Sequence, residues 1–181
     1  KRVSYIVVTK NRAQFLDDTL NRCRDLLMNE DELIVIDGAS ADNTKEIVEK
    51  HRDIINKFVS EPDSSAAEAH NKGIILARGK YARLVPDDDI VYSKAMEQAI
   101  ALLEKNPEVD LLVCGGTKEY VKKGKKSVVY LPSGTNYGSR PEDAILYGAS
   151  GAGHIMRRSV FAKVGLLLPT INTDIDFVMR C

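Results

Sequence analysis

The feature that most constrains the fold of this chain is a regular alternation of two hydrophobic patterns through residue 114. Short β-branched runs predict buried strands over residues 3–9, 33–36, 57–60, 81–85 and 109–114. Between them, apolar residues at helical spacing predict helices over residues 15–27, 41–50, 66–77 and 93–105. Strands that alternate with helices favour an α/β fold with a doubly wound, mostly parallel sheet and helices on both of its faces.

Three residues are expected to mark helix ends in this region. Asp42 is a candidate N-cap residue for the second predicted helix, and Ser93 is one for the fourth. Gly79 follows the third predicted helix, and we expect it to be the C-terminal cap.

The pattern changes after residue 115. Alternation over residues 117–131, broken by the lysine-rich segment 122–126, predicts a β-hairpin. A long ordered loop is expected over 133–153, then a strand or short helix within 155–164, and a helix that begins near Asp174. We expect one domain over residues 1–181, and we expect the chain to be a piece of a longer protein, because it begins without Met and stops just after an apolar periodic stretch.

Composition excludes several classes of protein. Lys plus Arg total 26 and Asp plus Glu total 26, so there is no net charge to attract nucleic acid, which is not an expected partner. Hydrophobic residues make up 44%, enough for a core and too many for a disordered chain, but no window resembles a membrane span. Three widely spaced cysteines form no zinc or disulfide pattern, which favours a reducing, cytoplasmic location.

Polar clusters follow four of the predicted strands. Residues 9–12, 37–40, 61–63 and 87–89 each come directly after a strand, and three of these clusters carry carboxylates. In parallel α/β sheets, ligands bind beyond the carboxyl ends of the strands. We therefore expect a single site where these four ends converge.

The Asp87-Asp88-Asp89 triplet is the strongest of these signals. Adjacent carboxylates repel one another, and a divalent cation such as Mg²⁺ or Mn²⁺ relieves that repulsion. Such an ion is usually held by one or two carboxylates together with phosphate oxygens of a substrate. The alternative is that the triplet only stabilises the N-terminus of the helix that follows near Ser93.

Other candidates also have two interpretations. Asp37 can accept hydrogen bonds from a base or a sugar hydroxyl, or it can be a turn residue that satisfies local backbone groups. Lys72 can contact phosphate or be a solvated lysine. Of Asp174 and Asp176, one can be a general base and the other a helix cap, since alternate residues do not face the same way. The lysines of 122–126 form a solvated tip or contact anionic lipid or acceptor phosphate.

Five ordered segments carry a resemblance to a known family. Residues 8–12 (VTKNR) resemble "PTYNR", and residues 34–44 (IVIDGASADNT) resemble "IVVDGGSTDGT". Residues 60–73 resemble "SEPDxGxYDAMNKG", residues 77–89 resemble "AxGxYxxxLxxDD", and residues 171–177 resemble "IxxDYDL". In this order, the segments are similar to those of a family-two glycosyltransferase of the GT-A fold.

The resemblance implies transfer of a sugar, with inversion and with Mn²⁺ or Mg²⁺, from a nucleotide-diphosphate donor to a saccharide or lipid-linked acceptor. Residues 1–114 would then be the nucleotide-binding half and residues 115–181 the acceptor-side half, with peripheral membrane contact at the cytoplasmic face. The nucleotide-binding residues that it implies are Thr9, Asn11, Arg12, Asp37, Lys72 and Asp87. The implied metal ligand is Asp88, with Asp89 as the other candidate, and the implied general base is Asp174.

Departures from the family pattern keep two alternatives open. Pro86 stands where the family often has Asp or Asn, and Ser64-Ser65 replaces a glycine. A non-catalytic nucleotide-sugar binding domain is one alternative. A sugar nucleotidyltransferase is the other, but it predicts a glycine-rich loop after the first strand, where this chain has Lys10 and Arg12 and no glycine.

Overall fold

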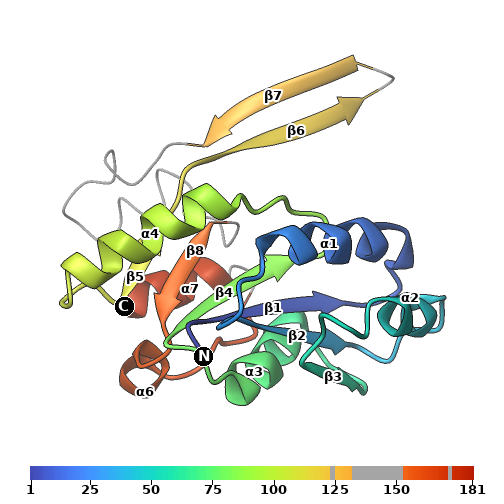
Figure 1. Cartoon of the computed structure of the whole chain (residues 1–181), viewed down its shortest axis with the longest axis horizontal. Coiled ribbons are helices and arrows are strands. Elements are labelled where there is room, and N and C mark those ends of the chain that lie inside the picture. Colours follow the sequence, from blue (N-terminus) through green and yellow to red (C-terminus); the bar gives the residue numbers. More distant parts are fainter. Residues whose placement is uncertain (123–124, 132–152, 171–172) are drawn as a thin grey trace.

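The computed structural model describes residues 1–122, 125–131, 153–170 and 173–181. The loop expected over 133–153 lies almost entirely outside the described residues, as does the tip of the expected hairpin. A six-stranded sheet forms the centre of the fold, with the strand order β3-β2-β1-β4-β8-β5 (Figure 1). Its strands are β1 (Val3–Thr9), β2 (Glu32–Asp37), β3 (Lys57–Ser60), β4 (Tyr81–Pro86), β5 (Leu111–Val113) and β8 (His154–Arg157).

The sheet is mostly parallel, as the alternating pattern predicted. β1 pairs in parallel with β2 and with β4, and β2 pairs in parallel with β3. β8 runs antiparallel to both of its neighbours, β4 and β5. The predicted fifth strand is therefore present, but β8 separates it from β4.

Helices cover both faces of the sheet. One face packs against α1 (Ala13–Leu26), α2 (Thr44–Lys50) and α4 (Ser93–Lys105), and the other against α3 (Ala66–Leu76), α6 (Val160–Val164) and α7 (Thr173–Arg180). The apolar stripes predicted for these helices supply the two core clusters, with Leu16 and Leu20 in one and Ile74 and Phe177 in the other.

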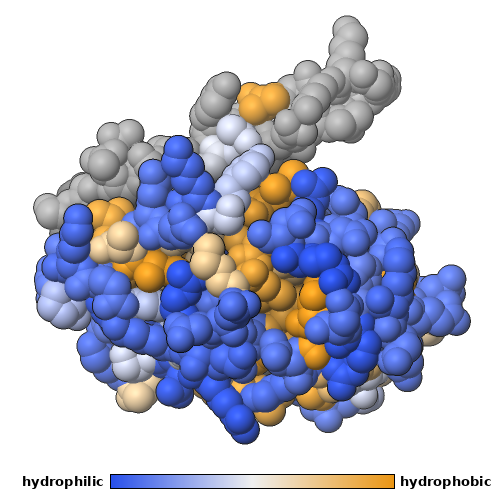
Figure 2. All heavy atoms as spheres, in the orientation of Figure 1, coloured by the Kyte–Doolittle hydropathy of each residue, from blue (hydrophilic) through white to orange (hydrophobic). Residues whose placement is uncertain are grey.

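The face with α1 and α4 also shows hydrophobic residues at the surface between the two helices (Figure 2). A crevice there is lined by Cys23, Leu26, Val85 and Val91, together with polar groups of α1. Its volume of about 10 Å³ is less than one water molecule needs, so this crevice is not a ligand site.

None of the three predicted caps is the cap residue of its helix. Asn43, not Asp42, is the N-cap residue of α2. Tyr92, not Ser93, is the N-cap residue of α4, and Ser93 is the first residue of the helix. Gly79 is not a helix cap, because α3 ends at Leu76 with an extended Ala77. A Cβ at Gly79 would lie 2.6 Å from the backbone nitrogen of Ser4, so the glycine allows a close approach to β1.

Asp42 serves two helices rather than one. Its Oδ1 accepts hydrogen bonds from the backbone N–H and the hydroxyl of Thr44, at the start of α2. Its Oδ2 accepts the backbone N–H of Ala13, the first residue of α1. The carboxylate therefore satisfies an unpaired donor at each helix N-terminus and fixes the two helices relative to each other.

The remaining elements follow the sequence pattern. β6 (Gly116–Lys122) and β7 (Lys125–Leu131) form the predicted hairpin, which stands away from the main sheet (Figure 1). The segment expected over 155–164 forms a strand, β8, and then a short helix, α6. α7 begins at Thr173, next to Asp174, as predicted.

Within the described part of the chain, no helix has both the length and the apolar character that crossing a bilayer requires.

Candidate functional site

The carboxyl ends of β1 and β4 meet at one edge of the sheet. Val8 pairs with Pro86 in the parallel register, so the residues that follow, Thr9 and Asp87, come side by side. The Thr9 hydroxyl donates a hydrogen bond of 3.0 Å to Oδ2 of Asp87. The first cluster and the acidic triplet, far apart in sequence, are thereby brought together.

Arg12 connects the first cluster to two of the three aspartates. It is the N-cap residue of α1, and its Nε lies 2.8 Å from Oδ1 of Asp87. Its Nη2 donates a hydrogen bond of 2.7 Å to Oδ2 of Asp88. The guanidinium also lies over the ring of Phe15, 4.6 Å from the ring centroid. The guanidinium of Arg12 therefore bridges the carboxylates of Asp87 and Asp88 at the carboxyl edge of the sheet.

Asp87 and Asp88 differ in their surroundings. Asp87 is 6% exposed, and burial raises the pKa of its carboxyl, although Thr9 and Arg12 favour the charged form. The Thr19 hydroxyl donates to the backbone oxygen of Asp87 at 2.6 Å, which fixes the turn after β4. The side chain of Asp88 is 53% exposed. Asp88 is thus the carboxylate of this pair that is open to a ligand.

Asp89 lies on another side of the turn. Its backbone N–H donates to the oxygen of Pro86, and its side chain lines the crevice beside α1 with Thr19 and Cys23. Among the described residues, no three Asp, Glu, His or Cys side chains form a group suited to a metal ion. A cation here would depend on one or two aspartates and on oxygens from a ligand.

A second cluster lies at the end of β2. Asp37 has no exposed surface, and its carboxylate accepts hydrogen bonds from the backbone N–H and the hydroxyl of Ser40 and from the hydroxyl of Ser60. The backbone N–H of Asn11 donates to Ser40 Oγ, and the Asn11 side-chain oxygen accepts the N–H of Ala41. This geometry is that of the turn residue offered as the alternative for Asp37, and its contact with a nucleoside stays a prediction.

The loops of this second cluster adopt an unusual backbone conformation. Asn11 has φ of 53° and Ala39 has φ of 59°, which are left-handed values that few residues other than glycine adopt. The side chain of Asp63 packs directly against Gly38. A Cβ added at Gly38 would lie 2.3 Å from Asp63 Oδ2. Lys10 in turn lies 3.3 Å from Oδ1 of Asp63.

Lys72 is not the solvated lysine that was the alternative for this position. Its Nζ lies 3.1 Å from Glu61 and 3.2 Å from Glu68, and it donates to the oxygen of Pro62 at 2.9 Å. Partial burial tends to lower the pKa of Lys72, but the two carboxylates outweigh that effect and raise it. The lysine is therefore charged and held at the end of β3, where its contact with phosphate stays a prediction.

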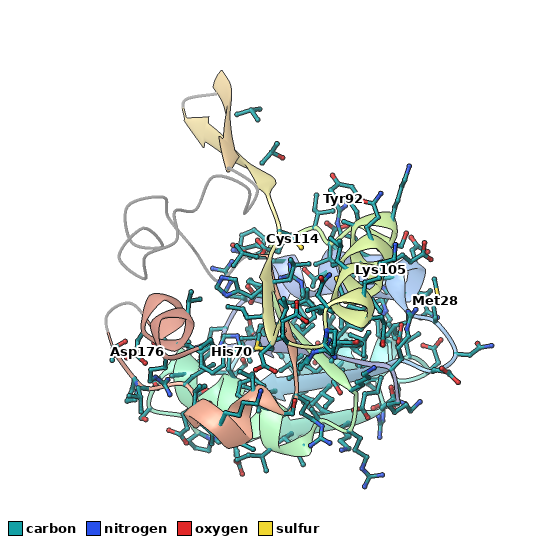
Figure 3. All side chains as sticks on the ribbon, turned by 90° about the vertical axis from the view of Figure 1, so that its left-hand side faces the viewer. Met28, His70, Tyr92, Lys105, Cys114 and Asp176 are labelled. Atoms are coloured by element: carbon teal, nitrogen blue, oxygen red, sulfur yellow. The ribbon has the colours of Figure 1, made fainter. Side chains whose placement is uncertain are left out.

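Two hydrogen bonds join Leu167, in the C-terminal segment, to Asn71 of α3. The Asn71 amide donates to the oxygen of Leu167 and accepts the N–H of Leu167, at 2.8 Å and 3.0 Å. Asp176 on α7 forms an ion pair of 2.9 Å with Arg180, and Figure 3 shows it across the molecule from Lys105 of α4. Asp174 is in the first turn of the same helix, and its role as a base stays a prediction.

Sequence reasoning missed several residues that complete the site. Ser60 stands directly opposite Asp37 in the parallel register, so pairing the two predicted strands would have found it. Thr19 interrupts the apolar stripe of α1 between Leu16 and Cys23, which is a signal that a hydroxyl is needed there. Ser40 was part of the predicted polar cluster 37–40 but had no role of its own, and Phe15 carried no signal because it fits the apolar stripe.

Comparisons with known proteins agree with this geometry. Residues 4–165 match the family described as Glycosyl transferase family 2. The chain is 28% identical over 117 residues to poly(ribitol-phosphate) beta-N-acetylglucosaminyltransferase TarS of Staphylococcus aureus, covering 62% of this chain and 20% of TarS. It is 32% identical over 111 residues to poly-beta-1,6-N-acetyl-D-glucosamine synthase of Staphylococcus epidermidis, covering 59% of this chain and 26% of the synthase. The matches thus span about a quarter or less of these relatives' length.

Solved structures show the same fold. The crystal structure of TarS 1-349 has a TM-score of 0.75 at 21% identity, and the match covers 99% of this chain and 55% of that one. The mannosyltransferase PcManGT from Pyrobaculum calidifontis, in complex with GDP-Man and Mn²⁺, has a TM-score of 0.71 at 21% identity, with 97% and 50% covered. The expected GT-A architecture is confirmed.

Proposed function

Since this chain belongs to glycosyl transferase family 2, we propose that it transfers a sugar from a nucleotide-diphosphate donor to an acceptor hydroxyl, with inversion and with the help of a divalent cation. The observation that carries the proposal is the pairing of Asp87 and Asp88 with Thr9 and Arg12 at the carboxyl edge of the sheet. That edge is where α/β sheets of this kind bind nucleotides.

The residues at the end of β4 fit a divalent cation. Asp88 offers a half-exposed carboxylate, which is the hard oxygen ligand that Mg²⁺ and Mn²⁺ prefer. Nε of Arg12 lies 2.8 Å from Oδ1 of Asp87, so the neighbouring carboxylate is already neutralised in part. We assign Asp88 as the main ligand, and Asp89 stays the second candidate. A cation bound there supplies charge stabilisation for the departing diphosphate.

The chain's own residues supply the remaining chemistry. Thr9 and Thr19 hold Asp87 in place, so that its carboxylate can accept hydrogen bonds from the ribose hydroxyls. Asp37 keeps the loop that carries Ser40 folded beside Asn11, which shapes the nucleoside site. Lys72 and Arg12 are cations that can contact the donor phosphates.

Asp174 is the proposed general base. It takes the proton from the acceptor hydroxyl as the oxygen attacks the anomeric carbon and the bond to the diphosphate breaks. Attack from the face opposite the leaving group inverts the anomeric centre. α7 packs on the face of the sheet that α3 also covers, separate from the helix that carries Arg12, which is compatible with a base opposite the diphosphate.

We further propose that the acceptor is a saccharide or polyol-phosphate polymer, either free or lipid-linked. The names of TarS and of the synthase both describe the synthesis or modification of such polymers. The proposed role is therefore polysaccharide biosynthesis with a nucleotide-sugar donor.

Activity on a panel of UDP- and GDP-sugars tests the proposal. We expect Mn²⁺-dependent release of UDP or GDP, abolished by EDTA and strongly reduced in Asp88→Asn, whereas Asp18→Asn, an exposed aspartate on α1, retains the activity. Nucleotide binding without turnover on any donor or acceptor would instead support the non-catalytic binding domain. Full activity of Asp88→Asn would contradict the assignment of the cation ligand.

A further inference from the structure

We infer that Arg12 occupies the cation's position on Asp88 while no donor is bound, so that the cation and the nucleotide diphosphate must enter together. This inference rests on the proposed function and adds an order of binding to it. Arg12 then acts as a positioning residue that keeps the acidic pair neutralised until both ligands are present.

The first argument is the geometry of the bridge. Arg12 contacts Asp87 Oδ1 at 2.8 Å and Asp88 Oδ2 at 2.7 Å, so a single guanidinium lies between the two carboxylates that face the site. Asp87 Oδ2 is already used by Thr9. Oδ2 of Asp88 is therefore already paired with the guanidinium when a cation approaches this carboxylate.

The second argument is charge. Asp87, Asp88 and Arg12 together carry a single negative charge, so a divalent cation bound to Asp88 alone, with Arg12 in place, would overcompensate it. Like charges a few ångströms apart repel strongly at a partly buried site. A nucleotide diphosphate removes this conflict, because its phosphate oxygens can take the guanidinium and complete the coordination of the cation.

The third argument is that Arg12 is bound in a way that permits release. Nε has no aligned hydrogen-bond acceptor among the described residues, although it is buried. Its contact with Asp87 is an ion pair of 2.8 Å, so it is the exposure of the side chain that permits release. The side chain of Arg12 is 40% exposed, and the ring of Phe15 beneath it offers an apolar support on which the planar group can move.

Lys72 is held differently and does not share this role. Its partners are Glu61, Glu68 and the oxygen of Pro62, none of which belongs to the acidic triplet. Removing Lys72 should therefore weaken nucleotide binding without changing the affinity for the cation alone.

Titration of Mn²⁺ without nucleotide tests the inference directly. We expect Arg12→Gln to bind Mn²⁺ about 10- to 100-fold more tightly than the original protein, which is the range for a hydrogen bond between charged groups. Arg12→Lys keeps the positive charge but lacks the planar guanidinium that bridges the two carboxylates. Its Mn²⁺ affinity should lie between that of Arg12→Gln and that of the original protein. Arg24→Gln is the matched control, because Arg24 is also on α1 and also pairs with an aspartate, Asp53. It should bind Mn²⁺ as the original protein does.

A fluorescent reporter tests the movement of Arg12. The chain contains no tryptophan, so Phe15→Trp places a single indole under the guanidinium. We expect its emission to change when Mn²⁺ and UDP or GDP are added together, and to change little with Mn²⁺ alone. In Phe15→Trp combined with Arg12→Gln, the response that depends on both ligands should be lost.

The outcomes separate the inference from the proposed function. Equal Mn²⁺ affinity of Arg12→Gln and the original protein, alongside normal cation-dependent turnover, overturns the inference and leaves the function standing. The inference is also overturned, and the function left standing, if the original protein binds Mn²⁺ as tightly without nucleotide as with it. Absence of Mn²⁺ binding in every variant, with nucleotide as well as without, overturns both.

Discussion

The two sides of the central sheet are built by different kinds of connection. From β3 to β4, each pair of neighbouring strands is parallel, and the intervening helices return the chain to the same edge. Beyond β4, β8 runs antiparallel and lies between β4 and β5, although the hairpin and the residues up to 152 separate it from β5 in sequence.

This difference determines what each side brings to the site. On the parallel side, each strand ends at the carboxyl edge, which gathers the last residues of β1 and β2, Thr9 and Asp37, with the residues that follow β3 and β4, Glu61 and Asp87. On the other side, β8 begins at that edge with His154, opposite Val113 of β5. In the proposed function, the parallel side therefore supplies the donor-binding groups, and the other side belongs to the proposed acceptor-side half, residues 115–181.

The largest expected effect tests this division of labour. Asp174→Asn should lower the transfer rate about 10²- to 10⁴-fold, because a general base contributes about that much. Binding of UDP or GDP, measured by thermal shift, should be unchanged, since the proposed donor-binding groups lie on the parallel side.

The matched control for that variant is Asp176→Asn. Asp176 already pairs with Arg180, four positions further along α7, so we expect this change to have little effect on rate. Loss of activity in Asp176→Asn with retention in Asp174→Asn would reverse the assignment of the base.

The next prediction concerns whether the two sides of the central sheet unfold as one unit. Ile34 of β2 and Ile155 of β8 have no exposed surface, so replacing either by alanine should cost about 2–5 kcal/mol of unfolding free energy. Val128→Ala on β7, where the side chain is 43% exposed, should cost less than about 0.5 kcal/mol.

Urea denaturation measures these three variants. Similar losses for the two isoleucines within a single transition are expected for one cooperative sheet. A separate early transition confined to Ile155→Ala would show that the β8 side is an independent unit.

A smaller effect compares one glycine from each region. Gly79→Ala places a Cβ against the backbone of Ser4 and should destabilise the protein by about 1–3 kcal/mol, as overpacking does. Gly116→Ala on β6 meets nothing within 4 Å and should stay within about 0.5 kcal/mol. Thermal unfolding of both variants provides the measurement, and equal stability would contradict the close packing of β1 at Gly79.

The smallest expected effect depends on pH and concerns the amino end of the parallel side. Glu32 is 2% exposed, and burial would raise its pKa, but hydrogen bonds from Ser4 and the backbone of Arg78 lower it below 4.5. The charged carboxylate therefore stabilises the fold above its ordinary pKa, and this contribution is lost as the pH falls through the lower folded-state pKa.

We expect Glu32→Gln to be about 1 kcal/mol less stable than the original protein at pH 7, on the scale of one hydrogen bond. The difference should shrink steadily as the pH falls below 4.5. Denaturation series at several pH values check this, and a difference that does not vary with pH would contradict a charged Glu32.

The difference between the parallel side of the sheet and the side beyond β4 also explains how much of the structure the sequence predicts. The strands and helices up to residue 114 follow from hydrophobic period, and the parallel register then places Thr9 beside Asp87. The position of β8 does not follow, because nothing local to His154–Arg157 states which two strands it will join. The prediction of helix caps was also wrong where tertiary packing determines the residue type. Gly79 is an example, because its backbone approaches Ser4.

Within the site, residue types were predictable but their partners were not. Arg12 and Asp37 were identified as charged groups at strand ends and Lys72 as one within a helix, yet the structure shows each of them already bound to a neighbour. Such pairings depend on distances between loops from different strands. Asp87 and Asp88 illustrate the limit, because adjacent identical residues have different exposure only once the turn after β4 is formed.

The insertion of β8 between β4 and β5 has a consequence for biosynthesis. A ribosome that adds about 5–20 residues per second needs roughly 2–8 seconds to pass from β5 to β8. Throughout that interval the outer side of β4 has no partner strand, and its free N–H and C=O groups are a template for another extended chain. The nascent protein is thus most vulnerable to misassociation before residue 157 has emerged, and slower emergence of this segment lengthens the exposure.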